Sequence, residues 1–372
     1  MDKLQEARSI INAVDKEIAA LFSRRMEAAK MVAEYKGERG LPIFDAEREA
    51  QLIAHNSRYI EDDDIRSYYV NFLQNLMDLS KQYQHRILDG LRVAYSGVEG
   101  AFAHIAVTRI FPDSTPISYR DFPSAYESVV KGECDCAVLP IENSFAGEVG
   151  QVSDLMFEGS LFVNGIYSLP ITHNLLGVKG ASLSDIRRVV SHPQALDQCA
   201  GYIHDHNFEQ VQSANTARAA QSVAEAGDIH TAAIASTETA ALYGLEILDH
   251  DIHESATNTT RFAVFSRVEN KATVGTSKSN FLLLFTVNDE AGALAKAINI
   301  IGKYGFNMHV LRSRPMKEPA WQYYFYVEAE GDETSLEGQR MLMELSLHCS
   351  MLKVVGHYAV EKNLAERELE TK

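Results

Sequence analysis

The sequence predicts a multidomain protein in which an all-α region of three helices, a two-lobed α/β region and a smaller α+β region follow one another. Three observations support this prediction. The chain has 372 residues, more than twice the ~150 residues of a typical domain. Apolar residues recur at helical spacing up to residue 90, and beyond it they gather in short runs separated by helical patterns. A polar stretch, residues 269–278, sets the last part of the chain apart.

Composition and charge narrow the class of protein. With 46% apolar and 23% charged residues, the chain has the composition of an ordinary globular protein, which argues against disorder. Its formal net charge of -16 repels nucleic acid and anionic lipid, so we expect neither as a partner. A site for an anionic ligand must therefore gather its few cations locally.

Targeting and cysteine patterns lead to two further expectations. No apolar run approaches the ~18 residues of a membrane span, and the start MDKLQEARS has no apolar signal core. We therefore expect a cytoplasmic protein without a membrane partner. The cysteines form no CxxC pair, so we expect reduced thiols and no zinc site; they are Cys134, Cys136, Cys199 and Cys349.

Residues 1–90 are predicted to be helical and to form the first domain. The first helix, from about Lys3 to Lys36, carries an apolar stripe and exceeds the ~25 residues at which such a pattern suggests a helical partner. Gly37 to Pro42 interrupts it, a second helix begins near Phe44, and a third extends from the acidic run 61–64 to about Leu88. The first helix cannot bury its stripe alone.

Residues 91–267 alternate between short β-rich runs and helices, which indicates an α/β domain with largely parallel sheets. Two such groups, 91–175 and 176–267, suggest two lobes with a ligand cleft between them. We expect the last strand, from Asn258, to return to the first lobe.

Residues 279–362 follow a βαββαβ order, which is the ferredoxin-like split βαβ arrangement. The charged tail from Asn363 is expected to fray.

Cations in the helical region are spaced so that some of them can meet. Arg25 and Lys36 are eleven residues apart, about 20° around one helix and about 16 Å along it, so both can reach one small ligand. Arg8 lies about 25 Å before Arg25 and about 100° around the axis, and it can reach the same ligand only from a second subunit.

The next two helices add polar side chains by the same geometry. Asp45, Arg48 and Glu49 share one helix face, and Ser80 shares another with Gln84. The set has no nucleophile–base pair and no metal cluster. Its cations and neutral donors suit a dicarboxylate and charge that develops on an oxygen. The alternative for each residue alone is a solvated charge on a helix surface.

The run LxxxRxxIxxxDxxIxxLFxxR, followed by Lys36 and PIFDAERE, resembles the all-helical chorismate mutase family over residues 1–90. The resemblance implies an interlocked dimer, with Arg8 supplied by the partner. It implies catalysis without a cofactor by Lys36, Arg48 and Gln84, and substrate binding by Arg25, Asp45, Glu49 and Ser80. In an alternative alignment Lys81 and His85 take the places of Ser80 and Gln84.

Four motifs stand at strand ends of the α/β region, where ligands gather in open sheets. They are GVEGAFAH (97–104), PIENSFAG (140–147), SHPQALDQC (191–199) and NTTRF (258–262). Taken singly, the glycine pair can be a turn, Ser191 a helix cap and Asn143 a turn residue.

Together these motifs resemble prephenate dehydratase over residues 91–267, with a two-lobed, periplasmic-binding-protein-like fold. The resemblance implies a direct catalytic role for Thr260. The implied substrate-binding residues are Asn143, Ser144, Ser191, Gln198 and Arg261. Loss of CO2 and water from prephenate requires a donor at the departing hydroxyl. Either Thr260 gives this proton or it orients a water.

The α+β region carries AGALA and RSRP, which resemble the amino-acid-binding ACT domain fused to prephenate dehydratases. The resemblance implies a phenylalanine site between paired domains, lined by Gly292, Ala293, Leu294, Ser313, Arg314 and Pro315. Arg312 stands where glutamate is common in these enzymes. The alternative is a dimerisation module without a ligand.

The three resemblances together imply a bifunctional enzyme of phenylalanine biosynthesis that is a homodimer or a larger homo-oligomer. It is expected to act as an isomerase on chorismate and as a lyase on prephenate, without metal or cofactor, and to be inhibited by L-phenylalanine. One alternative is a metabolite sensor whose N-terminal helices only dimerise it. Another is a dehydratase whose helical region is a dimerisation arm.

Overall fold

The computed structural model describes residues 2–255, 257–270, 279–316 and 322–365, and its contacts divide the chain into two compact units, Met1–Arg92 and Val93–Lys372. Most of the expected linker, residues 271–278, lies outside the described residues, so the boundary between 267 and 279 stays a prediction. No helix within the described ranges has the length and apolarity that crossing a membrane requires.

The first unit contains the three predicted helices, α1 (Lys3–Arg39), α2 (Ala46–Asn56) and α3 (Asp63–Asp89), with a 3-10 turn, η1 (Ser57–Tyr59), after α2. Each helix begins after an aspartate, and the side chains of Asp2, Asp45 and Asp62 accept hydrogen bonds from free N–H groups of the first turns. The chain leaves α1 through Gly40, whose φ of 62° favours glycine.

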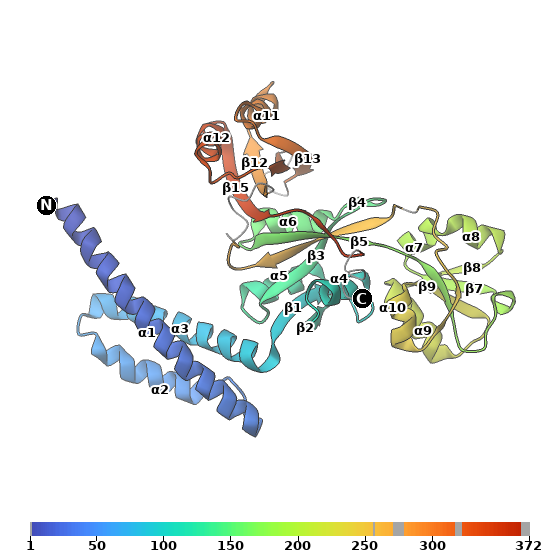
Figure 1. Cartoon of the computed structure of the whole chain (residues 1–372), viewed down its shortest axis with the longest axis horizontal. Coiled ribbons are helices and arrows are strands. Elements are labelled where there is room, and N and C mark those ends of the chain that lie inside the picture. The colour runs from blue at the N-terminus through green and yellow to red at the C-terminus, as the bar shows by residue number, and fades with distance from the viewer. Residues whose placement is uncertain (1, 256, 271–278, 317–321, 366–372) are drawn as a thin grey trace. The chain divides into compact units, whose positions relative to one another are not determined.

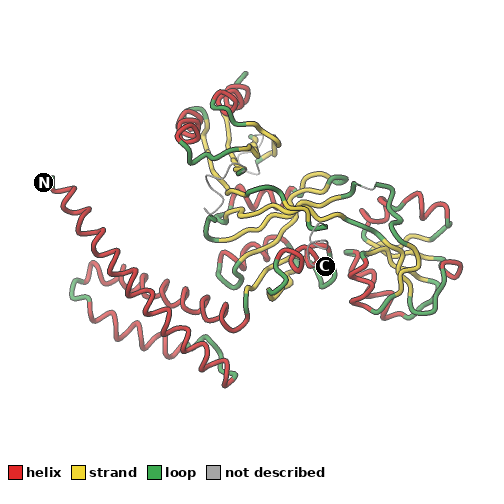
Figure 2. The backbone as a smooth tube through the Cα atoms, viewed as in Figure 1, coloured by secondary structure: helices red, strands yellow, loops and turns green. Residues whose placement is uncertain are grey.

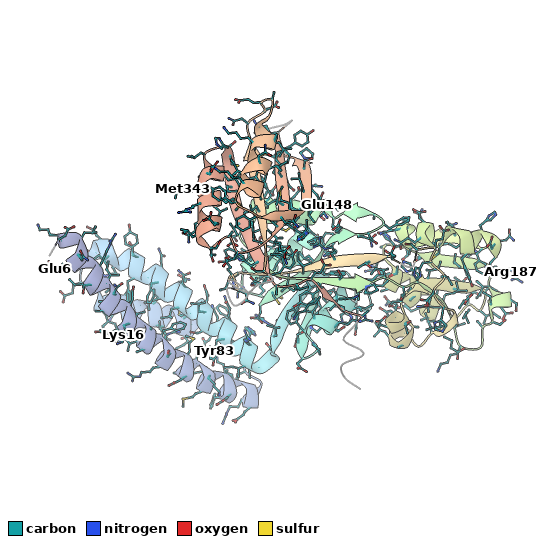
Figure 3. The ribbon with its side chains drawn as sticks, turned by 45° about the horizontal axis from the view of Figure 1, so that its top comes forward. Glu6, Lys16, Tyr83, Glu148, Arg187 and Met343 are labelled. Atoms are coloured by element: carbon teal, nitrogen blue, oxygen red, sulfur yellow. The ribbon has the colours of Figure 1, made fainter. Side chains whose placement is uncertain are left out.

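The N-terminal part of α1 projects beyond α2 and α3 (Figure 1). Its apolar side chains are largely exposed in this chain, including Ile10 at 60%, Val14 at 47% and Leu21 at 59%. Glu6 and Lys16, both on α1, are labelled in Figure 3, as is Tyr83 on α3. As expected, one copy of the chain leaves the apolar stripe of α1 uncovered.

The first lobe of the second unit is a sheet of strand order β5-β11-β3-β1-β2, with β4 beside β3. Its strands are β1 (Leu91–Ser96), β2 (Ser114–Tyr119), β3 (Cys136–Asn143), β4 (Gly147–Glu148), β5 (Phe162–Pro170) and β11 (Thr259–Ser266). Its helices are α4 (Phe102–Ile110), α5 (Phe122–Val130) and α6 (Gly150–Glu158). The prediction that the last strand returns to this lobe is confirmed, because β11 pairs with both β3 and β5.

The second lobe lies between β5 and β11 in sequence, so two chain segments connect the lobes (Figure 2). Its sheet has the order β10-β6-β9-β7-β8. The strands are β6 (Asn174–Gly177), β7 (Arg188–Ser191), β8 (Glu209–Gln212), β9 (Thr231–Ala235) and β10 (Glu246–Asp249). The helices are α7 (Pro193–Gln198), α8 (Ala200–Asp205), α9 (Thr216–Ala226) and α10 (Thr237–Tyr243), with a 3-10 turn, η2 (Leu183–Asp185).

The expectation of largely parallel sheets is wrong. Within the described residues β1 runs parallel to β3, and β7 runs parallel to β8 and β9. By contrast, β11 is antiparallel to both of its neighbours, and β6 is antiparallel to β9 and β10. The reason is that β6 and β11 connect the lobes and enter their sheets against the direction set by the βα units.

The C-terminal part has the predicted ferredoxin-like order, β13-β14-β12-β15. Its elements are β12 (Asn280–Val287), α11 (Ala293–Lys303), β13 (Asn307–Pro315), β14 (Tyr323–Glu330), α12 (Leu336–Ser346) and β15 (Cys349–Tyr358). β15 and the short β16 (Lys362–Asn363) both pair with β5, so one sheet continues from this part into the first lobe.

The expectation that the tail frays from Asn363 is wrong for its first residues. Asn363 pairs with Ser168 in β16, Leu364 is buried, and its N–H donates to the Ser168 carbonyl at 2.8 Å. Residues 366–372 lie outside the described residues.

Alternate side chains of β12 pack into two different cores. Leu282 and Leu284 join the core of the first lobe, together with Met156 of α6. Phe281 and Phe285 pack on the other side against residues of α11 and α12. Burial on both faces explains why this strand reads as the continuous apolar run FLLLFTV.

Candidate active sites

A cavity of about 430 Å³ in the helical unit is lined by side chains of all three helices. The residues predicted to share a site within one chain all line it; they are Arg25, Lys36, Asp45, Arg48, Glu49, Ser80 and Gln84. Arg8 does not line this cavity and is exposed on the projecting part of α1.

Three cations of this cavity have no carboxylate partner among the described residues. Arg25 Nη1 donates to the Leu76 carbonyl at 3.1 Å and to Ser80 Oγ, and Lys36 Nζ donates to the Ile43 carbonyl at 2.6 Å. The Arg48 guanidinium has no hydrogen-bond partner in the part of the chain that the structure describes. These positive charges are therefore available to an anionic ligand.

The N-terminal cap of α2 orients the residues that this helix contributes to the cavity. Asp45 Oδ1 accepts a hydrogen bond from the Arg48 main-chain N–H at 3.0 Å, which fixes the first turn of the helix that carries Arg48 and Glu49. Asp45 and Glu49 therefore lie beside the cations of the cavity, and within the described residues neither carboxylate pairs with the Arg48 guanidinium.

The third helix presents Ser80 and Gln84, which are both buried, to the cavity. Gln84 Oε1 has no hydrogen-bond partner among the described residues, so this oxygen is an acceptor available to a ligand. Lys81 also lines the cavity, but its ammonium pairs with Glu49 at 2.9 Å and Asp78 at 2.9 Å. His85 lies outside the cavity and bonds Asp89 at 2.8 Å.

A second cavity, of about 380 Å³, lies between the two lobes, as predicted. Its polar lining residues come from both lobes and include Ser96, Arg120, Asn143, His173, His192, Gln194, Gln198, Asn215, Thr216 and Thr260. No group of three or more side chains that could hold a metal ion is found among the described residues.

Asn143 and Thr260 face one another across the β3–β11 strand pair within this cavity. Asn143 Nδ2 donates to Thr260 Oγ1 at 3.0 Å, and Asn143 Oδ1 accepts from Gln194 Nε2 at 3.2 Å. Because the Thr260 oxygen accepts this bond, its own proton can be donated to a ligand.

Gln198 and His173 form a buried pair at the second-lobe side. Gln198 Oε1 accepts from His173 Nε2 at 2.8 Å and from Asn258 Nδ2 at 3.0 Å, so the protonated nitrogen of His173 is Nε2. Burial lowers the pKa of His173 to about 4, despite the opposing effect of the Gln198 hydrogen bond. Gln198 Nε2 has no partner among the described residues and is a free donor in the cavity wall.

The sequence analysis missed Arg120 and His173. Arg120 follows β2, and its Nε donates to Asp121 Oδ2 at 2.9 Å. It is the one lysine or arginine among the described residues that line this cavity. Its place directly after a β-rich run was a usable signal. For His173, which follows β5 in a run with no motif, the sequence offered none.

Two predicted residues lie outside the interlobe cavity because their hydroxyls serve the fold. Ser191 is buried, and its Oγ donates to the Ile234 carbonyl at 2.7 Å, which joins β7 to β9. Ser144 Oγ donates to the Thr257 carbonyl at 3.0 Å and accepts from the Thr259 N–H at 3.0 Å.

The expected carboxylate-binding role of Arg261 disagrees with this geometry. Successive side chains of a strand point to opposite faces of the sheet, so Arg261 points away from the face that carries Thr260. Its guanidinium instead hydrogen-bonds Glu142, Glu328 and Glu361, and it does not line the cavity.

The residues expected to bind phenylalanine are not gathered in one chain. Gly292 and Ala293 line a cavity of about 400 Å³ at the start of α11, while Leu294 packs on the core beneath it. Ser313, Arg314 and Pro315 lie on β13, where Arg314 Nε bonds Asp154 at 3.1 Å.

Two family models match the chain, one on each unit. The model described as chorismate mutase type II matches residues 7–85, and the model described as prephenate dehydratase matches residues 93–270. These ranges contain the helical cavity and the interlobe cavity, respectively.

Similar proteins match over most of the chain. A bifunctional chorismate mutase/prephenate dehydratase of Aquifex aeolicus is 32% identical over 96% of this chain and 98% of its own. The solved prephenate dehydratase of Arthrobacter aurescens, in complex with L-Phe, is 29% identical, with a TM-score of 0.67 over 73% of this chain and 90% of its own. A solved quorum-quenching acylase, GqqA, is 33% identical, with a TM-score of 0.67 over 73% of this chain and 98% of its own.

Proposed function

This chain belongs to the family of bifunctional chorismate mutase/prephenate dehydratases, and from that premise we propose how its two cavities divide the two reactions. The protein is an enzyme of phenylalanine biosynthesis that rearranges chorismate to prephenate and converts prephenate to phenylpyruvate. In the proposal the helical cavity catalyses the first step and the interlobe cavity the second. The observation that carries it is that Arg25, Lys36 and Arg48 line one cavity without carboxylate partners among the described residues.

In the helical cavity, the cations hold the two carboxylates of chorismate and favour its compact conformer. The rearrangement is pericyclic, so no residue has to act as a nucleophile or base. Lys36 Nζ and the amide nitrogen of Gln84 donate to the ether oxygen, which gains negative charge as its C–O bond breaks. Arg25 and Arg48 bind the carboxylates, which fixes the two reacting ends near one another.

In the interlobe cavity, Thr260 donates its hydroxyl proton toward the 4-hydroxyl of prephenate as that group departs as water, and a proton from solvent returns to the Thr260 oxygen. The Asn143 amide orients the Thr260 oxygen for this task. As CO2 leaves, the electron pair of its bond enters the ring and completes the aromatic system. Gln198 Nε2 and Arg120 are the donors that hold the carboxylates.

The proposal includes a homodimer formed by the helical unit. The exposed apolar stripe on the projecting part of α1 is too extensive for a free surface, and a second copy offers the matching stripe. Arg8 of the partner subunit then completes the helical cavity, because Arg8 of the same chain lies too far along α1 to reach it. Pairing of the C-terminal parts of different dimers would then give a larger homo-oligomer.

The C-terminal part is proposed to be an ACT domain that binds L-phenylalanine and inhibits the dehydratase. The support is the ferredoxin-like topology, the cavity beside Gly292 and Ala293, and the L-Phe complex of the Arthrobacter aurescens protein. Because Ser313–Pro315 lie away from that cavity within one chain, the effector site requires paired domains. A biosynthetic role places the enzyme in the cytoplasm in this proposal, which cell fractionation tests.

GqqA is named an acylase, and we do not propose that activity for this chain. Acyl transfer by a hydroxyl needs a base within hydrogen-bond reach. Among the described residues, neither Ser96, Thr216 nor Thr260 bonds a histidine, although all three line the interlobe cavity.

A coupled assay of the purified chain tests the proposed function. Chorismate consumption and phenylpyruvate formation are followed separately, without added cofactor, in the presence and absence of L-phenylalanine. We expect turnover in both steps and a slower second step with L-phenylalanine. Binding of chorismate or prephenate without turnover would instead indicate a metabolite sensor, and turnover of prephenate alone would indicate a dehydratase with a helical dimerisation arm.

A further inference from the structure

Two adjacent pairs of residues serve opposite faces of the first-lobe sheet. On one face Asn143 of β3 meets Thr260 of β11 in the interlobe cavity. On the other face their neighbours Glu142 and Arg261 are paired in register, and Arg261 Nη1 donates to Glu142 Oε2 at 3.1 Å. A displacement of either strand on the second face therefore moves the reacting groups on the first.

The second face is held by the C-terminal part through Glu328 of β14. Both of its carboxylate oxygens accept from the Arg261 guanidinium, at 2.9 and 2.8 Å, in a bidentate pair. The Glu328 side chain is 1% exposed and that of Arg261 is 15% exposed. A fork-shaped pair at this depth fixes direction as well as distance.

Two tyrosine hydroxyls also donate hydrogen bonds to the Glu328 carboxylate. The hydroxyls of Tyr326 and Tyr358 donate to Glu328 at 2.9 and 2.6 Å. Burial by itself raises the pKa of Glu328, but the hydrogen bonds and charge of Arg261 outweigh it and lower that pKa below its usual value. Glu328 is thus ionised and fully bonded at neutral pH.

A second bridge reaches the other strand of the site. Arg312 of β13 bonds Glu142 at 2.5 Å, and Glu142 directly precedes Asn143. The arginine that departs from the usual glutamate before SRP therefore has a carboxylate partner in the first lobe. Arg314 adds a third contact, to Asp154 of α6 at 3.1 Å, and Glu148 of β4, labelled in Figure 3, lies 3.9 Å from it.

We propose that Arg261 is a positioning residue of the dehydration, through which Glu328 of the C-terminal part holds Thr260 at its working distance from Asn143. Arg312 does the same for Asn143 through Glu142. The proposal deepens the proposed function and rests on its assignment of Thr260. It also gives the C-terminal part a role in catalysis that does not require a bound effector.

The test compares Glu328→Gln with Glu330→Gln. Glu330 lies on the same strand but is exposed, and its contact is His309 at 3.4 Å, so it is the matched control. We expect Glu328→Gln to lower the kcat for prephenate about tenfold or more, because displacements near 1 Å are costly in a preorganised site. The KM for prephenate, the mutase activity and the activity of Glu330→Gln should stay near those of the parent enzyme.

A double-mutant cycle separates positioning from a merely structural role. If Glu328 acts through the Thr260 hydroxyl, Glu328→Gln costs little further activity in a Thr260→Val background, whereas general loosening of the fold gives additive losses. Arg261→Lys, which keeps the charge but loses the fork, should show the same kcat defect with little change in KM. Arg261→Lys therefore tests the same positioning role if Glu328→Gln folds poorly.

The outcomes distinguish the two proposals. A parent-like kcat in both Glu328→Gln and Arg261→Lys overturns the positioning role while leaving the proposed function intact. Additive losses in the cycle, or a defect confined to KM, also overturn it. Full dehydratase activity in Thr260→Val overturns the assignment of Thr260 itself.

Discussion

The Asn143 amide donates to the Thr260 hydroxyl oxygen at 3.0 Å across two antiparallel strands. The bond leaves the threonine proton directed away from Asn143 and available to a substrate. A hydroxyl oriented in this way by a neighbouring amide can give a strong hydrogen bond to a departing group.

Removing the Thr260 hydroxyl should abolish most of the dehydratase activity. We expect Thr260→Val to lower kcat by about 10²-fold or more, the usual contribution of a proton donor, and Thr260→Ser to retain most of it. The control is Thr259→Val on the same strand, whose side chain does not line the cavity. An equal loss in the control would attribute the effect to the strand rather than to the hydroxyl.

Removing cations from the helical cavity should stop the first reaction alone. Lys36→Ala and Arg48→Ala are each expected to slow chorismate consumption by about 10²-fold or more, because each donor stabilises developing or fixed negative charge. Turnover of supplied prephenate should be unchanged. Lys30→Ala on the same helix, whose ammonium lies 3.9 Å from Glu34, is the control. Unchanged mutase activity in both variants would support the dimerisation-arm alternative.

A site shared between subunits should be restored by mixing variants. Arg8→Ala and Lys36→Ala chains are each expected to be poor mutases, but a mixed dimer contains one site with neither substitution. Co-refolded mixtures should therefore recover mutase activity. A mixture of Lys36→Ala and Arg48→Ala, whose residues line the same cavity of one chain, should not recover. Lack of recovery in the first mixture would exclude Arg8 of the partner subunit from the site.

Arg120 should contribute to prephenate binding rather than to the chemical step. We expect Arg120→Gln to raise the KM for prephenate about tenfold, the usual effect of losing one charge-assisted hydrogen bond, with kcat largely retained. Arg188→Gln is the control, because Arg188 is also exposed with one carboxylate partner, Glu209 at 3.1 Å, and lies outside the cavity. An unchanged KM in Arg120→Gln would show that Arg120 does not bind the carboxylates of prephenate.

Burial of His173 should make the fold sensitive to acid. Its pKa of about 4 in the folded state lies below the ordinary value of 6.5, so between these values the unfolded chain binds more protons. The stabilisation is complete above pH 6.5 and is lost as the pH falls toward 4, by about 3 kcal/mol at 1.36 kcal/mol per pH unit. Denaturant unfolding of the parent and of His173→Gln across this range measures the difference, which should shrink as the pH falls. A difference that does not change with pH would contradict the assignment.

The helical unit was largely predictable from sequence, because local signals determine it. Capping aspartates, helical spacing and one glycine stop place the helices within a few residues, and the cavity cations follow from helix geometry. The interlobe site was harder to predict. His173 reaches it through long-range packing, which no local pattern reports, whereas the place of Arg120 directly after a β-rich run was a signal that could have found it.

Arg261 illustrates a different difficulty. The alternation of side chains along β11 implies that Thr260 and Arg261 face opposite sides of the sheet, whereas the family resemblance implied a catalytic role for Thr260 and a substrate-binding role for Arg261 at one site. Similarly, β16 and the buried Leu364 were missed because their pairing with β5 joins residues far apart in sequence. Partners in a sheet are set by the whole fold rather than by the short segment that makes the strand.

The continuous sheet has a consequence for any shortened form of this chain. β5 is an interior strand only because β15 and β16 run along its outer side, through Gly356 at Val163 and Lys362 at Tyr167. In a protein that ended after β11, β5 would be an edge strand with unpaired main-chain donors and acceptors. Such edge strands pair with strands of neighbouring molecules. We therefore expect a chain trimmed before β15 to associate through the exposed edge of β5.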